Sequence, residues 1–169
     1  MTFAEAANKF GTDKHYGCGY GPLYDTYVIP KIQPQSVILE IGVHLGASLR
    51  MWELLFPQAS IIGIDNNPEC KKYESDRSLV FIGDQADQTF LQSIAQAGID
   101  LVVDDGSHHL HDMITSFVTL WPLTRVVYVI EDIWDESLPL LENAVKLTGA
   151  NTIVAASSSP HRFIMFICK

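Results

Sequence analysis

The chain of 169 residues alternates between two hydrophobic patterns. Short apolar runs that end at glycine, proline or acidic residues predict buried strands. The predicted strands are residues 36–41, 60–65, 79–82, 100–105, 126–131, 152–156 and 163–167. Apolar residues spaced three or four positions apart predict helices. The predicted helices are residues 2–10, 22–28, 47–55, 87–97, 109–120 and 136–147. Strands that alternate with helices indicate parallel pairing through right-handed crossovers.

The last two predicted strands are an exception, because only the short turn 157–161 separates them. Such strands pair as antiparallel neighbours. We therefore predict an α/β fold with a Rossmann-like, doubly wound sheet that is mostly parallel, with one antiparallel strand near the edge. The length favours a single domain over residues 1–169. Residues 1–35 precede the regular pattern and are expected to form an N-terminal helical or loop arm, or a lid.

Composition narrows the range of partners. Hydrophobic residues make up 47% of the chain, which is enough for a full core, and the formal net charge is −9. This charge disfavours a nucleic-acid backbone or an anionic membrane as the main partner. No apolar run approaches the roughly 20 residues of a membrane span, and the first ten residues lack a signal-peptide core. The three cysteines are scattered, which favours reduced thiols, and we expect a cytoplasmic protein.

Acidic residues and histidines gather where two of the central strands end. The run 101–103 is followed by Asp104, Asp105, Gly106, Ser107, His108 and His109. Open α/β sheets bind ligands at the carboxyl ends of their strands. If the strand that ends in Glu131 and Asp132 is the neighbour, three carboxylates converge there, and they repel unless they are protonated or bound to a cation. The alternative is that some of these acids cap helices and face solvent.

Oxygen ligands of this kind suit Mg²⁺. A histidine beside them suits a general base near neutral pH, a role that we assign to His108. Because successive strand residues face opposite sides of a sheet, Asp104 is expected to point away from Asp105 and is not a primary metal ligand.

The first three strands end in residues that suit a nucleoside. Gly42 and Gly46 allow a tight turn into a helix and close approach of a ligand. Their Gly-x-x-x-Gly spacing differs from the dinucleotide pattern, because His44 stands where a middle glycine is expected. Asp65 follows at the distance of a ribose-binding acid, and Asp84 with Gln85 ends the third strand. The simpler reading is a tight strand-to-helix turn without a ligand.

The segment 11–21 is rich in glycine and tyrosine, including Tyr16 and Tyr20. Such a segment suits a mobile cover that excludes water from a site. A packed arm or a subunit contact fits equally well, so both alternatives stay open, as does a homo-oligomer.

Taken in order, these motifs resemble the class I S-adenosylmethionine-dependent methyltransferases. Within that class they resemble the metal-dependent macrocin and mycinamicin sugar O-methyltransferase branch, to which cephalosporin-hydroxylase-type proteins are similar. The resemblance covers residues 10–132. The motifs that carry it are FGTDK at 10–14, LEIG at 39–42, GAS at 46–48, Trp52, FP at 56–57, GID at 63–65, GDQ at 83–85, DDGSH at 104–108 and YVIED at 128–132.

The resemblance implies a role for each matched residue. Cofactor contacts are assigned to Glu40, Gly42, Gly46, Ser48, Asp65, Asp84, Gln85 and Asp104. Metal ligands are assigned to Asp105, Glu131 and Asp132, and general-base function to His108. Apart from the resemblance, we expect Lys14, Tyr16, Tyr20 and His109 to be substrate or lid contacts. The implied activity is Mg²⁺-assisted O-methylation, by S-adenosylmethionine, of a hydroxylated small molecule such as a sugar, a polyketide glycoside or another natural-product intermediate.

Two departures from the family limit this expectation. Residues 122–125 (PLTR) replace a Pro-Gly-Gly-like turn, and only residues 133–137 separate the acidic strand from the next helix. The acceptor therefore does not follow from the resemblance. A nicotinamide-dependent reductase and a non-catalytic S-adenosylmethionine-binding subunit are the alternatives.

Overall fold

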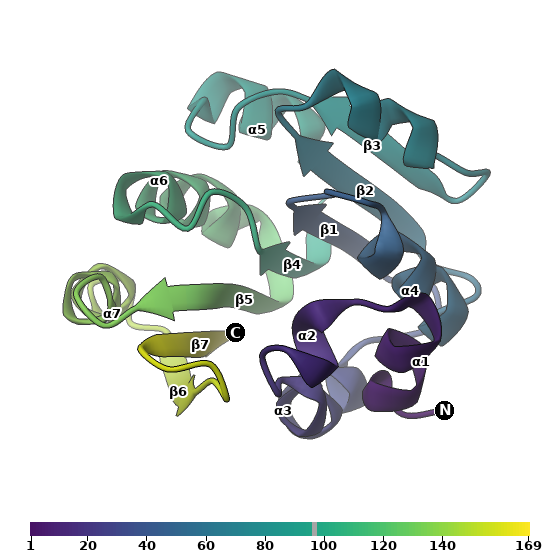
Figure 1. Cartoon of the computed structure of the whole chain (residues 1–169). Coiled ribbons are helices and arrows are strands. Elements are labelled where there is room, and N and C mark those ends of the chain that lie inside the picture. Colours follow the sequence, from purple (N-terminus) through teal and green to yellow (C-terminus); the bar gives the residue numbers. More distant parts are fainter. Residues whose placement is uncertain (96–97) are drawn as a thin grey trace.

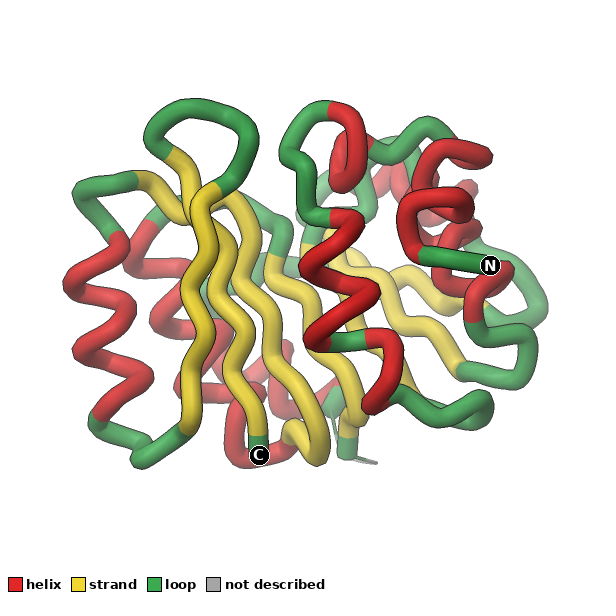
Figure 2. The backbone as a smooth tube through the Cα atoms, turned by 90° about the horizontal axis from the view of Figure 1, so that it is seen from below, coloured by secondary structure: helices red, strands yellow, loops and turns green. Residues whose placement is uncertain are grey.

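The computed structural model describes residues 1–95 and 98–169. Its strands form one seven-stranded sheet in the order β3-β2-β1-β4-β5-β7-β6. Figure 2 shows these strands side by side with helices flanking them. The strands are β1 (Val37–Ile41), β2 (Ser60–Asp65), β3 (Ser78–Ile82), β4 (Ile99–Asp104), β5 (Thr124–Trp134), β6 (Asn151–Ala156) and β7 (Arg162–Cys168). All seven predicted strands are confirmed.

The pairing also follows the prediction. Strands β1 to β5 pair in parallel, and β7 pairs antiparallel with both β5 and β6. The predicted fold class, with one antiparallel strand near the edge, is confirmed. The order of strands reverses between β1 and β4, which are adjacent in the sheet. This switch point is where ligands bind in open α/β sheets.

Strand β5 is longer than the predicted range 126–131. Beyond a register shift between Ile130 and Ile133, it continues to pair with β7 through Ile133 and Trp134. Asp132 has a positive φ of 52° within this shift. Glu131 and Asp132 therefore lie at an irregularity inside a strand and not at its end, because pairing with the distant β7 prolongs β5.

Helices cover both faces of the sheet (Figure 1). Those on the first face are α1 (Phe3–Phe10), α2 (Asp13–Tyr16), α3 (Gly21–Tyr27) and α4 (Ala47–Leu55), and those on the second are α5 (Gln88–Ile94), α6 (Leu110–Leu120) and α7 (Leu138–Lys146). Three short 3-10 helices are η1 (Ile29–Lys31), η2 (Pro68–Tyr73) and η3 (Trp121–Leu123). The predicted helix 87–97 reaches residues 96–97, which lie outside the described residues. No described helix is long and apolar enough to cross a membrane.

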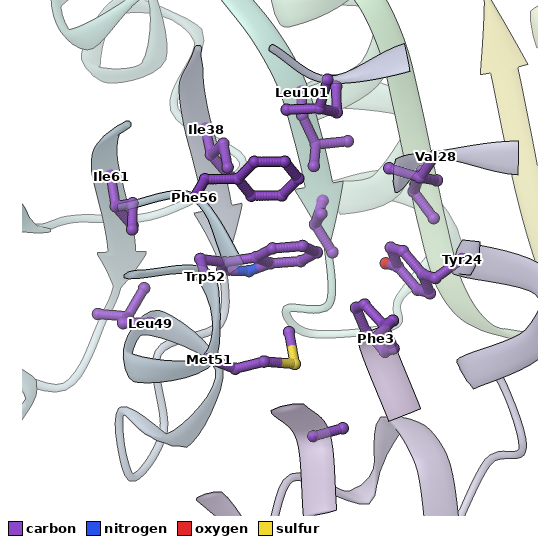
Figure 3. Close-up of a cluster of buried hydrophobic side chains, with 14 of the residues drawn as sticks. Phe3, Tyr24, Val28, Ile38, Leu49, Met51, Trp52, Phe56, Ile61 and Leu101 are labelled. Carbon is purple, nitrogen blue, oxygen red and sulfur yellow. The ribbon is translucent and has the colours of Figure 1, made fainter. Parts of the chain in front are cut away.

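The N-terminal arm packs on the first face of the sheet. Phe3 and Tyr24 stack with their ring centroids 4.2 Å apart, and both contact the ring of Trp52 on α4. Figure 3 shows these rings in one cluster with Ile38 of β1, Ile61 of β2 and Leu101 of β4. Each fully buried aromatic side chain stabilises the fold by roughly 1.5–3 kcal/mol. The segment 11–21 contains the short helix α2, and the arm is held on the sheet by the contact of Phe3 and Tyr24 with Trp52.

Candidate active site

A cavity of about 1020 Å³ opens at the carboxyl ends of the parallel strands, beside the switch point. The residues predicted from the sequence that line it are Lys14, Gly42, Ser48, Asp65, Asp84, Gln85, Asp105, His108, His109 and Asp132. The predicted residues that do not line it are Tyr16, Tyr20, Glu40, Gly46, Asp104 and Glu131. The cavity thus joins the nucleoside-type residues of β1 to β3 with the acidic residues of β4 and β5.

The turn after β1 forms one wall of the cavity. Gly42 has φ 95°, and a Cβ atom at this position would overlap the carbonyl oxygen of Asp105. The Asp65 Oδ2 atom accepts hydrogen bonds from the backbone amides of Val43 (2.9 Å) and His44 (3.0 Å). Its Oδ1 atom accepts from the amide of Asn67 at 2.9 Å. Although partial burial opposes the effect, these amides lower the pKa of Asp65 below its usual value, so Asp65 fixes the loop as an anion.

Asp104 and Gln85 form a network behind the cavity. Gln85 donates from Nε2 to Asp104 at 3.1 Å and accepts at Oε1 from the Ser107 amide at 2.7 Å. Asp104 also accepts from the hydroxyls of Ser116 and Tyr128. Burial raises its pKa to about 6, against these hydrogen bonds. Asp104 points away from the cavity, as strand alternation predicts, and links β4 to α6 and β5.

Lys14 projects from the arm toward acidic side chains of three neighbouring segments of the sheet. Its Nζ atom lies 3.1 Å from Glu40, 2.6 Å from Asp105 and 2.8 Å from Glu131, and its side chain is only 2% exposed. Burial alone would lower the pKa of Lys14, but the three carboxylates raise it well above its usual value. Trp52 donates to Glu40, and the Tyr24 hydroxyl donates to Glu131. Lys14 is therefore a buried ammonium ion shared by three strands.

Asp132 is bound by a different set of donors. The Tyr20 hydroxyl donates to Oδ1 at 2.7 Å, and the Arg162 guanidinium donates to Oδ2 at 2.6 Å. Arg162 lies over the ring of Trp134, 4.5 Å from its centroid. The sequence analysis missed both Arg162 and Tyr24, because nothing in their local sequence shows that they reach β5 carboxylates.

Three side chains face one another closely enough to hold an ion. One ligand atom from each of Asp105, His108 and Asp132 lies within 4.8 Å of the others. His108 Nε2 is 3.9 Å from Asp105 Oδ1, and its buried Nδ1 has no hydrogen-bond partner among the described residues. Glu131, also predicted as a ligand, lies outside this group, because its oxygens accept from Lys14 and Tyr24.

The remaining predicted substrate or lid residues are dispersed. His109 is exposed at the cavity and precedes α6. Tyr16 is 77% exposed, and Tyr20 is fully buried. The two tyrosines that shared one prediction thus face opposite environments, and only Tyr20 contacts an acidic residue of the site.

The curated relatives described below are O-methyltransferases. No protein-family model matches the sequence. The mycinamicin VI 2''-O-methyltransferase of Micromonospora griseorubida is 39% identical over 131 residues, which are 71% of this chain and 33% of that protein. A tetracenomycin 3'-O-methyltransferase of Streptomyces olivaceus, which acts on a 2-methoxy-rhamnosyl compound, is 36% identical over 132 residues, again 71% and 33% of the two chains.

A solved structure of a related methyltransferase matches the whole of this chain. MycE methyltransferase from the mycinamycin pathway, in complex with Mg, S-adenosylhomocysteine and mycinamycin VI, matches with a TM-score of 0.83 and 29% identity. The match covers 100% of this chain and 54% of MycE, so the chain spans about half of MycE and a third of the curated relatives. A putative caffeoyl-CoA O-methyltransferase from Staphylococcus aureus (TM-score 0.61, 14% identity) shares the fold. The chain is a homologue of the macrocin- and mycinamicin-type sugar O-methyltransferases and has their class I methyltransferase fold.

Proposed function

We propose that this chain is an S-adenosylmethionine-dependent, Mg²⁺-assisted O-methyltransferase that acts on a hydroxyl of a small molecule, with sugars of polyketide glycosides as the favoured substrate class. The observation that carries this proposal is the open group of Asp105, His108 and Asp132 on the wall of a cavity with nucleoside-type residues. The names of the relatives support the substrate class, since they describe methylation of sugar hydroxyls.

The cavity fits the proposed cofactor. Its volume of about 1020 Å³ is at the upper end of ligand pockets. Thr12 lines it with a buried hydroxyl that has no hydrogen-bond partner among the described residues. Gly42, Ser48 and Asp65 would hold the amino-acid and ribose parts, and Asp84 with Gln85 would flank the base. When bound, S-adenosylmethionine supplies an electrophilic methyl group.

The acidic group fits a divalent cation. Asp105 and Asp132 offer carboxylate oxygens, the ligands that Mg²⁺ prefers. That preference leaves the imidazole of His108 free for proton transfer. Glu131 would complete the predicted ligand set only by leaving Lys14 and Tyr24. When bound, the ion lowers the pKa of a hydroxyl group that it contacts.

His108 carries the proton step in this proposal. Its ring is partly exposed at the cavity wall, with Nε2 toward Asp105. As a neutral imidazole it accepts the proton of the acceptor hydroxyl. The cavity walls would orient the acceptor oxygen toward the bound cofactor, and alignment of this kind supplies much of the acceleration in such reactions.

The test is methyl transfer to a panel of glycosides that includes mycinamicin VI and demethylmacrocin, with Mg²⁺ or with EDTA, read by mass spectrometry. We expect one added methyl group that depends on Mg²⁺. Binding of S-adenosylhomocysteine by calorimetry, without transfer to any acceptor, would identify a non-catalytic cofactor-binding module. Binding of NADH in place of S-adenosylhomocysteine would favour the reductase alternative.

A further inference from the structure

Lys14 is buried at a position where the proposed reaction assigns it no part. Its ammonium group contacts Glu40, Asp105 and Glu131, which come from three adjacent strands. All three distances are within 3.1 Å, so the group is a tight three-way ion pair. A buried cation this close to three carboxylates neutralises charge that would otherwise attract a metal ion or a proton.

The two carboxylate oxygens of Asp105 face different groups, and each defines one side of the side chain. Oδ2 accepts from Lys14 at 2.6 Å, whereas Oδ1 faces His108. The first side belongs to the buried cluster with Glu40 and Glu131, and the second faces His108, a member of the open group. One carboxylate therefore joins an organic cation on one side to the candidate metal site on the other.

The charges of the two clusters agree with this division. Four carboxylates, those of Glu40, Asp105, Glu131 and Asp132, are faced by the cations of Lys14 and Arg162. Lys14 offsets one negative charge of this set, and its removal leaves the set one charge more negative.

We propose that Lys14 is a positioning residue that acts as a built-in cation: its ammonium group occupies the buried side of the carboxylates of Glu40, Asp105 and Glu131 and weakens the binding of a divalent ion on the open side of Asp105. The proposal rests on the metal site of the proposed function. This role can be told apart from a purely structural one by removing Lys14. If Lys14 only held Asp105 in place, its loss would disorder Asp105 and weaken metal binding. If Lys14 competes with the metal ion, its loss would strengthen metal binding.

The probe is Mn²⁺ alone, titrated into the full chain and followed by electron paramagnetic resonance of the free ion. We expect the wild type to bind one equivalent. K14M should bind Mn²⁺ about tenfold or more tightly, or bind a second equivalent, because a nearby like charge is removed. K146M is the matched control: it removes one lysine charge from the exposed end of α7 and should bind as the wild type does.

If K14M does not fold, the same test can be made by comparing Mn²⁺ binding of K14M/E131Q with that of E131Q. The double variant loses one charge of each sign, and it should bind Mn²⁺ more tightly than E131Q does. Equal or weaker binding in both comparisons overturns the proposal. If the wild type binds no Mn²⁺ but K14M does, the role of Lys14 stands and the metal requirement of the proposed function fails. If neither binds, both fail.

Discussion

The two halves of the cavity are built differently. One half, here called the cofactor half, is lined by residues that follow β1, β2 and β3. There Asp65 is held by the amides of residues 43, 44 and 67, within 22 positions along the chain. The other, the acidic half, contains Asp105 and Asp132. There Lys14 contacts Asp105, 91 positions away along the chain, and Glu131, 117 positions away. The first half is thus set by local turns, and the second by contacts between distant segments. The difference implies that substitutions in one half should leave the ligand of the other half in place.

The largest expected effect comes from H108A. Loss of a general base typically reduces turnover by about 10²–10⁴-fold. Binding of S-adenosylhomocysteine and of Mn²⁺ should stay within about twofold of the wild type, since oxygen ligands carry the ion. Steady-state kinetics and calorimetry measure the two quantities. Full turnover in H108A would remove His108 from the mechanism.

The next largest effect is expected from D105N, which changes the acidic half and leaves the cofactor half as it is. D105N should weaken Mn²⁺ binding by about 10–100-fold, because a neutral amide replaces a charged ligand. The affinity for S-adenosylhomocysteine should hardly change, since Asp105 contributes only one part of a large cavity wall. Parallel titrations of both ligands make the comparison. Equal losses of the two would show that the halves are not independent.

The reciprocal substitution is D65N. It removes the charge that accepts from the part-buried amide of Val43 and the exposed amide of His44, which weakens the anchoring of the Gly42 loop. We expect S-adenosylhomocysteine to bind about tenfold more weakly, while Mn²⁺ binds as in the wild type. D84N is a useful companion, because Asp84 lines the same half but anchors no part of the Gly42 loop. A loss of Mn²⁺ binding in D65N would contradict the division.

The smallest effect concerns stability and involves neither ligand. The pKa of Asp104 is raised to about 6 from an ordinary value of 3.8, so the folded state binds more protons than the unfolded state between these values. This contribution to stability is present at low pH and is lost as the pH rises to about 6. Relative to D104N, the wild type should lose on the order of 2 kcal/mol between pH 4 and pH 7. Urea unfolding at both pH values measures it, and a difference that does not vary with pH would refute it.

The same contrast explains what could be predicted from the sequence. The strands, their mostly parallel pairing and the opposite directions of Asp104 and Asp105 follow from local apolar pattern and strand alternation. The position of β7 between β5 and β6 does not. The true extent of β5 does not, because its last residues are held by β7. Nor do the partners of Lys14 and Asp132, since a lysine or arginine far along the chain carries no local sign of the carboxylate that it will meet.

The N-terminal arm is hydrogen-bonded to the turn between β6 and β7, and these contacts have a consequence for the order of folding. The carbonyl of Cys18 accepts from the Ser158 amide and the Ser157 hydroxyl, and Ser158 and Ser159 also donate to the carbonyl of Gly17. These contacts span about 140 positions and come from the same two regions that supply Tyr20 and Arg162 to Asp132. Contacts of such long sequence separation form late, after shorter loops have closed. Because Arg162 is the first residue of β7, Asp132 acquires this donor only after β7 has been synthesised.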